Sequence, residues 1–327
     1  MTRVFSGIQP SGSLHIGNYV GALRQWVVDQ SVDDAYFCVV DLHALTTDTS
    51  PELITERTTK TAVGLLAVGL DPAKCTIFLQ SHVPEHAELA WILECNTSFG
   101  ELRRMTQFKE KSADQKMVRA GLFTYPVLMA ADILIYDTDK VPVGDDQRQH
   151  LELTRDLALR FNANYGETFV VPQADVPKVG ARVMDLQRPD KKMSKSTSTE
   201  AGLISIDDSP DEIRKKIRRA VTDTETEVRF DPDQKPGVSN LLELLAAARG
   251  DAPASLAERY SSYGALKDDT AEAVIELLAP IRLRHTELEQ DPEAVRSVLE
   301  KGAETAQSVA RKTLARARHA VGLVERR

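Results

Sequence analysis

Short apolar runs alternate with longer helix-like stretches through the first 165 residues, and this alternation restricts the fold most. The runs at Val4–Ile8, Tyr36–Val40, Thr76–Leu79 and Val141–Val143 are continuously apolar, as expected of strands that are covered on both faces. Strands separated by helices at this spacing are typical of a parallel sheet with helices on both sides. The sequence therefore predicts an α/β fold with a doubly wound parallel sheet.

Helical periodicity and capping residues place the helices between these runs. Ser50 and Pro51 form a typical helix start, with a capping hydroxyl before a proline in the first turn. The segment Arg103–Lys116 is polar and rich in lysine, and an apolar helix is expected after it. Helices are expected at Gly17–Val28, from Pro51 to about Val68, at Glu85–Glu94, over a stretch that contains Tyr125–Ile135, and at Asp146–Phe161.

The pattern changes near Pro189, after which no strand-like run alternates with the helices. Helix-like segments follow at Pro210–Val221, Asn240–Arg249 and Asp269–Leu283. Apolar residues at three-to-four spacing in Glu293–Val324 predict either one long helix or two short ones. We therefore expect two domains, an α/β domain over residues 1–188 and a smaller all-helical domain over residues 189–292.

Charge and cysteine content exclude several protein classes. The net charge of −8 argues against indiscriminate nucleic-acid binding. No apolar run reaches the length of a membrane span, and no secretory signal is visible at the N-terminus. Cys38, Cys75 and Cys95 are odd in number and widely spaced, so we expect buried thiols rather than disulfides or a zinc cluster. These features predict a cytoplasmic protein with no membrane association.

The loop Gly7–Asn18 after the first strand is the first candidate site, because open α/β sheets bind ligands at the carboxyl edge. Neither the Walker pattern nor the dinucleotide fingerprint fits this loop. His15 and Asn18 lie at the mouth of a helix, where free N–H groups favour an anion. Gly17 and Gly21 lack side chains, so a flat ring could pack against the helix. The alternative is an ordinary glycine-rich turn.

The second candidate site is Lys191–Ser196, on a loop rich in serine and threonine. Lys192 and Lys195 are three residues apart and flanked by hydroxyls, which makes a flexible cationic clamp. Such a clamp suits a polyphosphate whose charge shifts during a reaction. The alternative is a solvated run of charge.

Together the two loops resemble the class I aminoacyl-tRNA synthetases, through His15–Asn18 and Lys192–Ser196. Phe5–Gly12, Met105–Ser112, Met129–Asp132 and Gly144–Gln147 extend the resemblance to the bacterial tryptophanyl-tRNA synthetases. Asn18 stands where the class consensus has a second histidine, a difference common in this subgroup.

The resemblance implies a Rossmann-like catalytic domain, an anticodon-binding role for residues 189–292, and a C-terminal helix over about 293–327 that packs back on the catalytic half. It implies L-tryptophan, ATP and tRNA(Trp) as partners, a homodimer, and Mg²⁺ carried by the ATP phosphates without a protein metal cage. The implied catalytic residues are Gln9, His15, Asn18, Lys111, Lys192 and Lys195. The implied ATP-binding residues are Gln9, Pro10, Ser11, Gly17, Asn18, Gly144, Asp145, Asp146, Val183, Lys192, Met193, Ser194, Lys195 and Ser196.

Asp132 is the candidate for recognising the amino acid. An indole N–H donates a hydrogen bond and accepts none, so a selective pocket needs an acceptor. Asp132 is a carboxylate in an otherwise apolar helix. By itself it could equally be a cap or an ion-pair partner; with the resemblance, it is expected to accept from the indole. The resemblance implies apolar walls from Phe5, Met129, Val141 and Val143, and contacts to the α-amino end from Tyr125, Gln147 and His43.

Three alternatives remain open. A tyrosyl-tRNA synthetase shares both ATP motifs, although its pocket typically offers a tyrosine as well as an aspartate. A zinc peptidase would use His82 and His86 in an HxxEH pattern, which Pro84 opposes by opening the following helix. A nucleotide- or RNA-binding paralogue without catalysis is the third, and the intact lysines of the second loop oppose it.

Overall fold

The structure is a computed structural model and describes residues 2–31, 34–47, 50–113, 117–144, 147–175, 182–195 and 198–324. Its strands all pair in parallel, in the order β3-β2-β1-β4-β5. This Rossmann-like sheet confirms the predicted α/β fold, and it brings the carboxyl ends of the strands to one edge. The strands are β1 (Arg3–Ile8), β2 (Asp34–Val39), β3 (Thr76–Leu79), β4 (Lys140–Pro142) and β5 (Gln173–Asp175).

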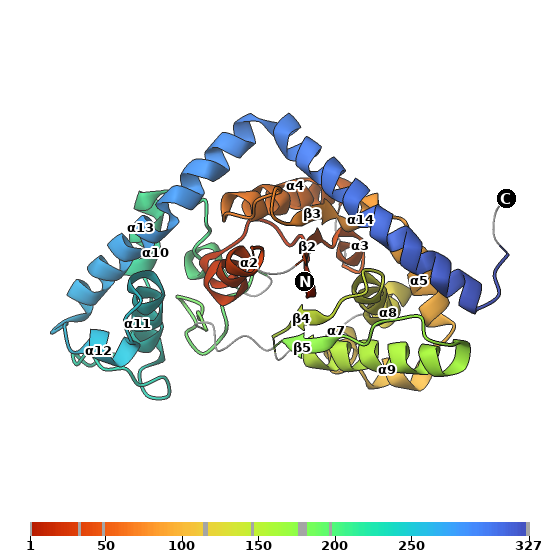
Figure 1. The fold of residues 1–327 in the computed structure, drawn as a ribbon. Helices are drawn as coiled ribbons and strands as arrows, with labels where there is room; N and C mark the ends of the chain where they lie inside the picture. The colour runs from red at the N-terminus through yellow and green to blue at the C-terminus, as the bar shows by residue number, and fades with distance from the viewer. Residues whose placement is uncertain are drawn as a thin grey trace.

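Helices cover both faces of the sheet (Figure 1). Side chains of β2 alternate between two hydrophobic clusters, Phe37 and Val39 on one face, Tyr36 and Cys38 on the other. The covering helices before residue 170 are α1 (Ile16–Asn18), the π-helical segment η1 (Tyr19–Leu23), α2 (Arg24–Asp29), α3 (Asp41–Ala44), α4 (Pro51–Ala67), α5 (Glu85–Glu94), α6 (Phe99–Arg104), α7 (Thr106–Ser112), α8 (Ala120–Leu134) and α9 (Arg148–Tyr165).

Local capping chemistry explains where the sequence interpretation succeeded and where it was wrong. The Ser50 hydroxyl accepts a hydrogen bond from the Leu53 N–H at 3.4 Å, which confirms the predicted start of α4. The polar segment Arg103–Lys116, for which no helix was predicted, carries the end of α6 and the whole of α7. Ser98 and Glu101 form a capping box that starts α6.

Cys95, expected to be buried, is exposed just after α5, whereas Cys38 and Cys75 are buried.

The second half of the chain is helical, with α10 (Pro210–Arg218), α11 (Pro236–Arg249), α12 (Pro253–Ala257) and α13 (Tyr263–Gln290). One hydrophobic cluster continues from the sheet into these helices, since Leu65 of α4 and Leu241 of α11 belong to it. Arg284 of α13 donates to the carbonyl of Leu66 at 3.1 Å. In the described ranges, no helix combines the length and apolar composition needed to cross a bilayer.

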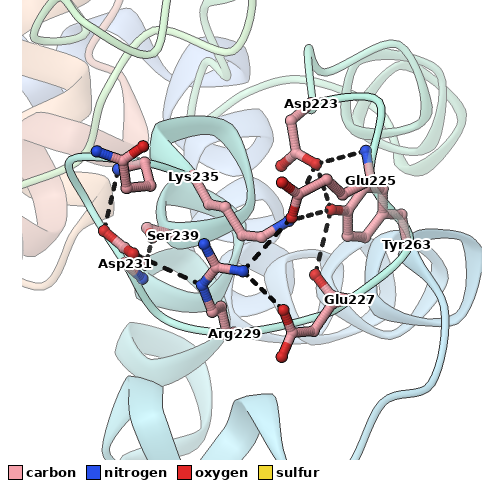
Figure 2. A network of polar contacts seen from close by, with 9 residues as sticks. Asp223, Glu225, Glu227, Arg229, Asp231, Lys235, Ser239 and Tyr263 are labelled. Atoms are coloured by element: carbon pink, nitrogen blue, oxygen red, sulfur yellow. Dashed lines mark hydrogen bonds and ion pairs between the residues drawn. The ribbon is translucent and has the colours of Figure 1, made fainter.

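A buried lysine orders the loop before α11 (Figure 2). The Lys235 side chain is 1% exposed, and its ammonium lies 3.0 Å from Asp223, 2.7 Å from Glu225 and 2.8 Å from the Tyr263 hydroxyl. Burial opposes the charge, but the bonds to these partners outweigh it and raise the pKa of Lys235. The network ties the loop to α13, because Tyr263 begins that helix.

The last helix, α14 (Pro292–Ala320), runs back across the α/β half beside β3 and α5 (Figure 1). Its basic residues make ion pairs: Arg311 contacts Glu85 at 3.0 Å, and Arg318 contacts Glu88. At Gly302 the backbone of α14 packs directly against β3, because a Cβ there would lie 1.9 Å from the carbonyl oxygen of Ile77 in β3. Only a glycine allows the helix to pack this close to the strand.

The Gly302→Ala substitution should therefore destabilise the protein, although alanine normally favours a helix over glycine. We expect a loss of about 2 kcal/mol in the free energy of unfolding, because the added methyl group forces α14 away from β3. Gly264→Ala in α13 is the matched control, since a Cβ at this position meets nothing within 4 Å. Chemical denaturation of both variants measures the difference, and equal stability of the two would contradict the packing account.

Candidate active site

Backbone contacts fix the loop after β1 above the carboxyl edge of the sheet. The Ile16 N–H donates to the carbonyl of Ile204 at 2.9 Å, and the Ile206 N–H donates to the carbonyl of Leu14 at 3.0 Å. His15 and Ser205 thus face each other in an antiparallel bridge. Two parts of the chain nearly 200 residues apart in sequence are held side by side.

The second motif is anchored in the same region by its methionine. Met193 is 2% exposed, and its N–H donates to the carbonyl of Val183 at 3.1 Å. Lys192 is exposed, and Lys195 extends back to the first loop. A Cβ at Gly12 would lie 3.1 Å from Lys195 Nζ, and the φ of Gly12 is +117°. The structure therefore brings the two predicted motifs together, and a side chain at Gly12 would both be strained and crowd the lysine.

Positive charge gathers around this junction. Lys195, Arg57 and Lys60 line a cavity of about 400 Å³ together with Ser11 and Gly12, and the carboxylates of Glu56, paired with Lys60 at 2.7 Å, and Glu200 line it too. Burial lowers the pKa of Lys195 to about 8, with Arg57 and Lys60 adding to the effect and Asp207 opposing it. A concentration of cations beside the start of a helix is suited to a polyphosphate.

His15 is neutral at physiological pH. Burial, followed by the charges of Lys195 and Lys192, lowers its pKa to about 4. Its Nδ1 atom is buried and has no partner in the described part of the chain. A Cβ at Gly17 would lie 2.9 Å from this Nδ1 and 3.7 Å from Val183, so Gly17 keeps the start of α1 open between the two side chains. Asn18 caps this turn, since its Oδ1 accepts from the His15 N–H at 3.1 Å.

The carboxylate of Asp132, on α8, lies at the centre of a buried hydrogen-bond network. Its Oδ1 accepts from Gln80 Nε2 at 2.7 Å and pairs with His86 Nδ1 at 2.6 Å. Its Oδ2 pairs with His43 Nε2 at 2.8 Å. The residue is 1% exposed. Burial by itself raises the pKa of Asp132, but the bonds and charges of His43 and His86 outweigh it and lower the pKa to about 2.

The predicted aromatic and polar contacts lie near this carboxylate. The His43 ring packs edge-to-face on Tyr125, with centroids 6.2 Å apart, and its backbone carbonyl accepts from Gln9 Nε2 at 3.5 Å. The Tyr125 hydroxyl donates to Gln107 at 3.1 Å. Lys111 Nζ lies 5.5 Å above the Tyr125 ring, so the structure places this lysine beside the expected amino-acid pocket.

The apolar wall residues also share one hydrophobic cluster. Phe5, Val141 and Val143 are buried in it, and Met129 packs against it. Gln147 lies at the start of α9, and its N–H donates to the carbonyl of Gly144 at 3.0 Å. The predicted site residues Asp145, Asp146 and Ser196 lie outside the described residues.

The comparison with known families identifies the fold that carries this geometry. Residues 1–279 match the family described as tRNA synthetases class I (W and Y). The chain belongs to this class I tRNA synthetase family. Its members are ATP-dependent ligases, and the family assignment confirms the expected enzyme class. A zinc peptidase is excluded as the family of this chain.

Several proteins similar to this chain are named tryptophan–tRNA ligase or tryptophanyl-tRNA synthetase. The chain is 56% identical over 329 residues to tryptophan–tRNA ligase 1 of Streptomyces coelicolor, covering 99% of this chain and 98% of the relative. It is 39% identical to the solved tryptophanyl-tRNA synthetase of Mycoplasma pneumoniae, with a TM-score of 0.89 over 99% of this chain and 98% of that one. The Campylobacter jejuni tryptophanyl-tRNA synthetase, solved with ADP and tryptophan, is 36% identical, with a TM-score of 0.86 and coverage of 98% and 100%.

The geometry of the HxxEH segment also opposes a zinc site. His82 ends the short 3-10 segment Gln80–His82 and is exposed, and Pro84 precedes the first residue of α5. His86 is fully buried inside the helix, with one ring nitrogen on Asp132 and the other on the Tyr136 hydroxyl. The two histidines therefore do not converge on a shared metal position.

Sequence reasoning missed the groups that support Asp132. Gln80 and His86 contact the carboxylate, and Tyr136 contacts His86; only folding brings these groups together. A buried carboxylate requires several donors, so the need for partners could be inferred from Asp132 alone. The identity of Gln80 and His86 as these partners could not be inferred, because they lie 52 and 46 residues from Asp132 in the sequence.

The pH dependence of the synthetase should report Lys195. With a pKa of about 8, its ammonium is charged below this pH and loses its charge as the pH rises through it. We expect kcat/KM for ATP, which reports ionisations of the free enzyme, to fall above about pH 8. Lys195→Arg stays charged and should remove this fall. The measurement is ATP–pyrophosphate exchange as a function of pH; an identical alkaline limb in both enzymes would contradict the assignment.

Proposed function

We propose that this synthetase is a tryptophan–tRNA ligase that activates L-tryptophan with ATP and transfers it to the 3′ end of tRNA(Trp). The observation that carries the amino-acid assignment is the buried carboxylate of Asp132, which lies beside the cluster of Phe5, Met129, Val141 and Val143. Its negative charge and acceptor oxygens match the indole N–H, which donates and does not accept. The tryptophan ligases among the relatives support the same substrate.

ATP binds, in this proposal, between the first loop and the second motif. Gln9, Pro10, Ser11, Gly17 and Asn18 would hold it from the loop and helix start, and Val183 would contact the base. Gly144, Asp145 and Asp146 would contact the ribose and adenine side. Lys192, Met193, Ser194, Lys195 and Ser196 would follow the β- and γ-phosphates, with Mg²⁺ carried by those phosphates.

The reaction follows from this placement. A tryptophan carboxylate oxygen attacks the α-phosphorus, the bond to the bridging oxygen breaks, and pyrophosphate leaves with the electron pair. The carboxylate needs little activation, so the protein contributes positioning and charge neutralisation. Lys195, close to Gly12, is placed to neutralise charge on the departing pyrophosphate. Neutral His15 would act as a hydrogen-bonding group.

The α-amino end of tryptophan would be held by Tyr125, Gln147 and His43. Lys111, above the Tyr125 ring, would reach from this end towards the phosphates. Tyrosine is the competing substrate within the family. Its phenol hydroxyl both donates and accepts, so a pocket centred on an acceptor-only carboxylate favours the indole.

Transfer to RNA requires the helical half and a second subunit in this proposal. Residues 189–292 would read the anticodon of tRNA(Trp), and the enzyme would act in the cytoplasm as a homodimer. Trp91 on α5 and Phe99 on α6 are 66% and 69% exposed. In this proposal these side chains belong to the surface through which the two subunits associate.

An exchange assay tests the substrate directly. Of the twenty amino acids, tryptophan alone should support ATP–pyrophosphate exchange, and tRNA(Trp) should then be charged. Exchange supported by tyrosine in place of tryptophan would establish the alternative substrate. No exchange with any amino acid would establish a binding protein without catalysis.

The Asp132→Asn substitution should weaken the use of tryptophan far more than the use of ATP. An amide offers only one acceptor oxygen and cannot satisfy the same donors, so we expect kcat/KM for tryptophan to fall about 100-fold. The KM for ATP should change by less than about threefold, because ATP binds through other residues. Asp269→Asn in α13 is a matched control and should leave exchange unchanged. Equal losses for the two substrates would contradict the role of Asp132.

Replacing Phe99 with glutamate should weaken subunit association. A charge placed at the centre of an apolar interface is desolvated without a partner, so the equilibrium should shift towards monomers. Sedimentation of Phe99→Glu compared with the unmodified protein measures this shift. Leu283→Glu is the control, because Leu283 is 65% exposed on α13 in the helical half. A shift of both variants, or of neither, would count against this surface.

A further inference from the structure

The two oxygens of the Asp132 carboxylate carry unequal numbers of hydrogen bonds. Each carboxylate oxygen has two acceptor positions. Both positions on Oδ1 are used, by Gln80 Nε2 at 2.7 Å and His86 Nδ1 at 2.6 Å. Oδ2 accepts from His43 Nε2 at 2.8 Å, and it is the oxygen that retains an acceptor position towards a ligand.

The two oxygens also face different surroundings. Gln80 and His86 are completely buried, so the Oδ1 side is closed to a substrate. His43 is 9% exposed, and it contacts Tyr125 and Gln9, both predicted site residues. The available position on Oδ2 therefore lies on the side of the proposed tryptophan and ATP pockets.

Further contacts hold the Oδ1 donors in the donating orientation. Gln80 Oε1 accepts from the Leu42 N–H at 3.1 Å, which turns the amide so that its NH₂ group faces Asp132. Tyr136 OH lies 2.7 Å from His86 Nε2. The Asp132 carboxylate only accepts hydrogen bonds, so Nδ1 of His86 carries the proton of this contact, and the Tyr136 hydroxyl holds the ring at its other nitrogen. Each donor is thus fixed by a group that touches no predicted ligand.

We propose that Gln80 and His86 are positioning residues for amino-acid selection: they occupy Oδ1 of Asp132, lock the plane of the carboxylate, and direct its remaining acceptor position on Oδ2 to the indole N–H. The proposal rests on the tryptophan–tRNA ligase function proposed above. Removing either donor frees an acceptor position on Oδ1, and the carboxylate can then rotate away from the geometry that distinguishes an N–H group. Selectivity, more than activity, should depend on these two residues.

A substrate pair isolates this effect. L-3-benzothienylalanine has the shape of tryptophan, with sulfur in place of the N–H group, and therefore cannot donate to Oδ2. The ratio of kcat/KM for tryptophan to kcat/KM for this analogue, measured by ATP–pyrophosphate exchange, reports the hydrogen bond alone. Both substrates use the same folded enzyme molecules, so partial misfolding of a variant cancels from the ratio.

His86→Leu removes one donor, and we expect the ratio to fall about tenfold, the usual effect of losing an oriented buried hydrogen bond. His86→Asn places an amide N–H where Nδ1 was, and it should restore the ratio to within about threefold of the original enzyme. Gln80→Met removes the other Oδ1 donor and should lower the ratio as well; it decides the question if His86→Leu does not fold. His285→Leu is the matched control, since His285 is buried in α13 and contacts Glu289 instead.

Unchanged ratios in Gln80→Met and in folded His86→Leu, with equal losses for the two substrates, would show that the residues are only structural and would overturn the proposal. A fall in His285→Leu as large as in His86→Leu would overturn it too. If the unmodified enzyme activates tryptophan and the variants keep its ratio, this inference alone fails. If the unmodified enzyme shows no tryptophan-dependent exchange, the proposed function itself fails.

Discussion

The antiparallel contact between the loop after β1 and residues 204–206 is the constraint on which the rest of the site depends. The hydrogen bonds of Ile16 with Ile204 and of Leu14 with Ile206 join the first turn of the catalytic half to a segment that leads into the helical half. Met193 is buried in the same hydrophobic cluster as Leu14 and Ile204, so the exposed Lys192 and the half-buried Lys195 stand on a fixed base. A mobile cation on a rigid anchor can follow a phosphate whose charge changes, without reorganising the fold.

The buried carboxylate on α8 is a second constraint of a different kind. Removing a negative charge from water costs several kcal/mol unless donors replace the solvent. Gln80, His43 and His86 supply these donors and come from the ends or surroundings of β2 and β3. Helix α14 then closes over β3 and α5 at Gly302 and Arg311. The same packing that covers the sheet thus supports the residue that we propose selects the amino acid.

The elements that follow from local rules were predictable from sequence. The strand Thr76–Leu79 and the helix Glu85–Glu94 form with the expected bounds, because a continuous apolar run and a proline-started helix are local signals. The strand β5 (Gln173–Asp175) was not expected, since its residues are exposed and polar at the edge of the sheet and are selected only by pairing with β4. The motif residues were found from sequence, and their meeting point at Gly12 and Lys195 required the fold. The partners of Asp132 are long-range contacts, which no periodicity encodes.

The most direct test of this account is a crystal structure of the enzyme with a non-hydrolysable sulfamoyl analogue of tryptophanyl-adenylate. The account predicts the indole nitrogen at about 2.9 Å from Oδ2 of Asp132, with Oδ1 still bonded to Gln80 and His86. It also predicts the sulfamoyl group, which takes the place of the α-phosphate, beside the first loop. An indole ring whose nitrogen points away from Asp132 would contradict the central claim, even if the nucleotide part were bound as expected.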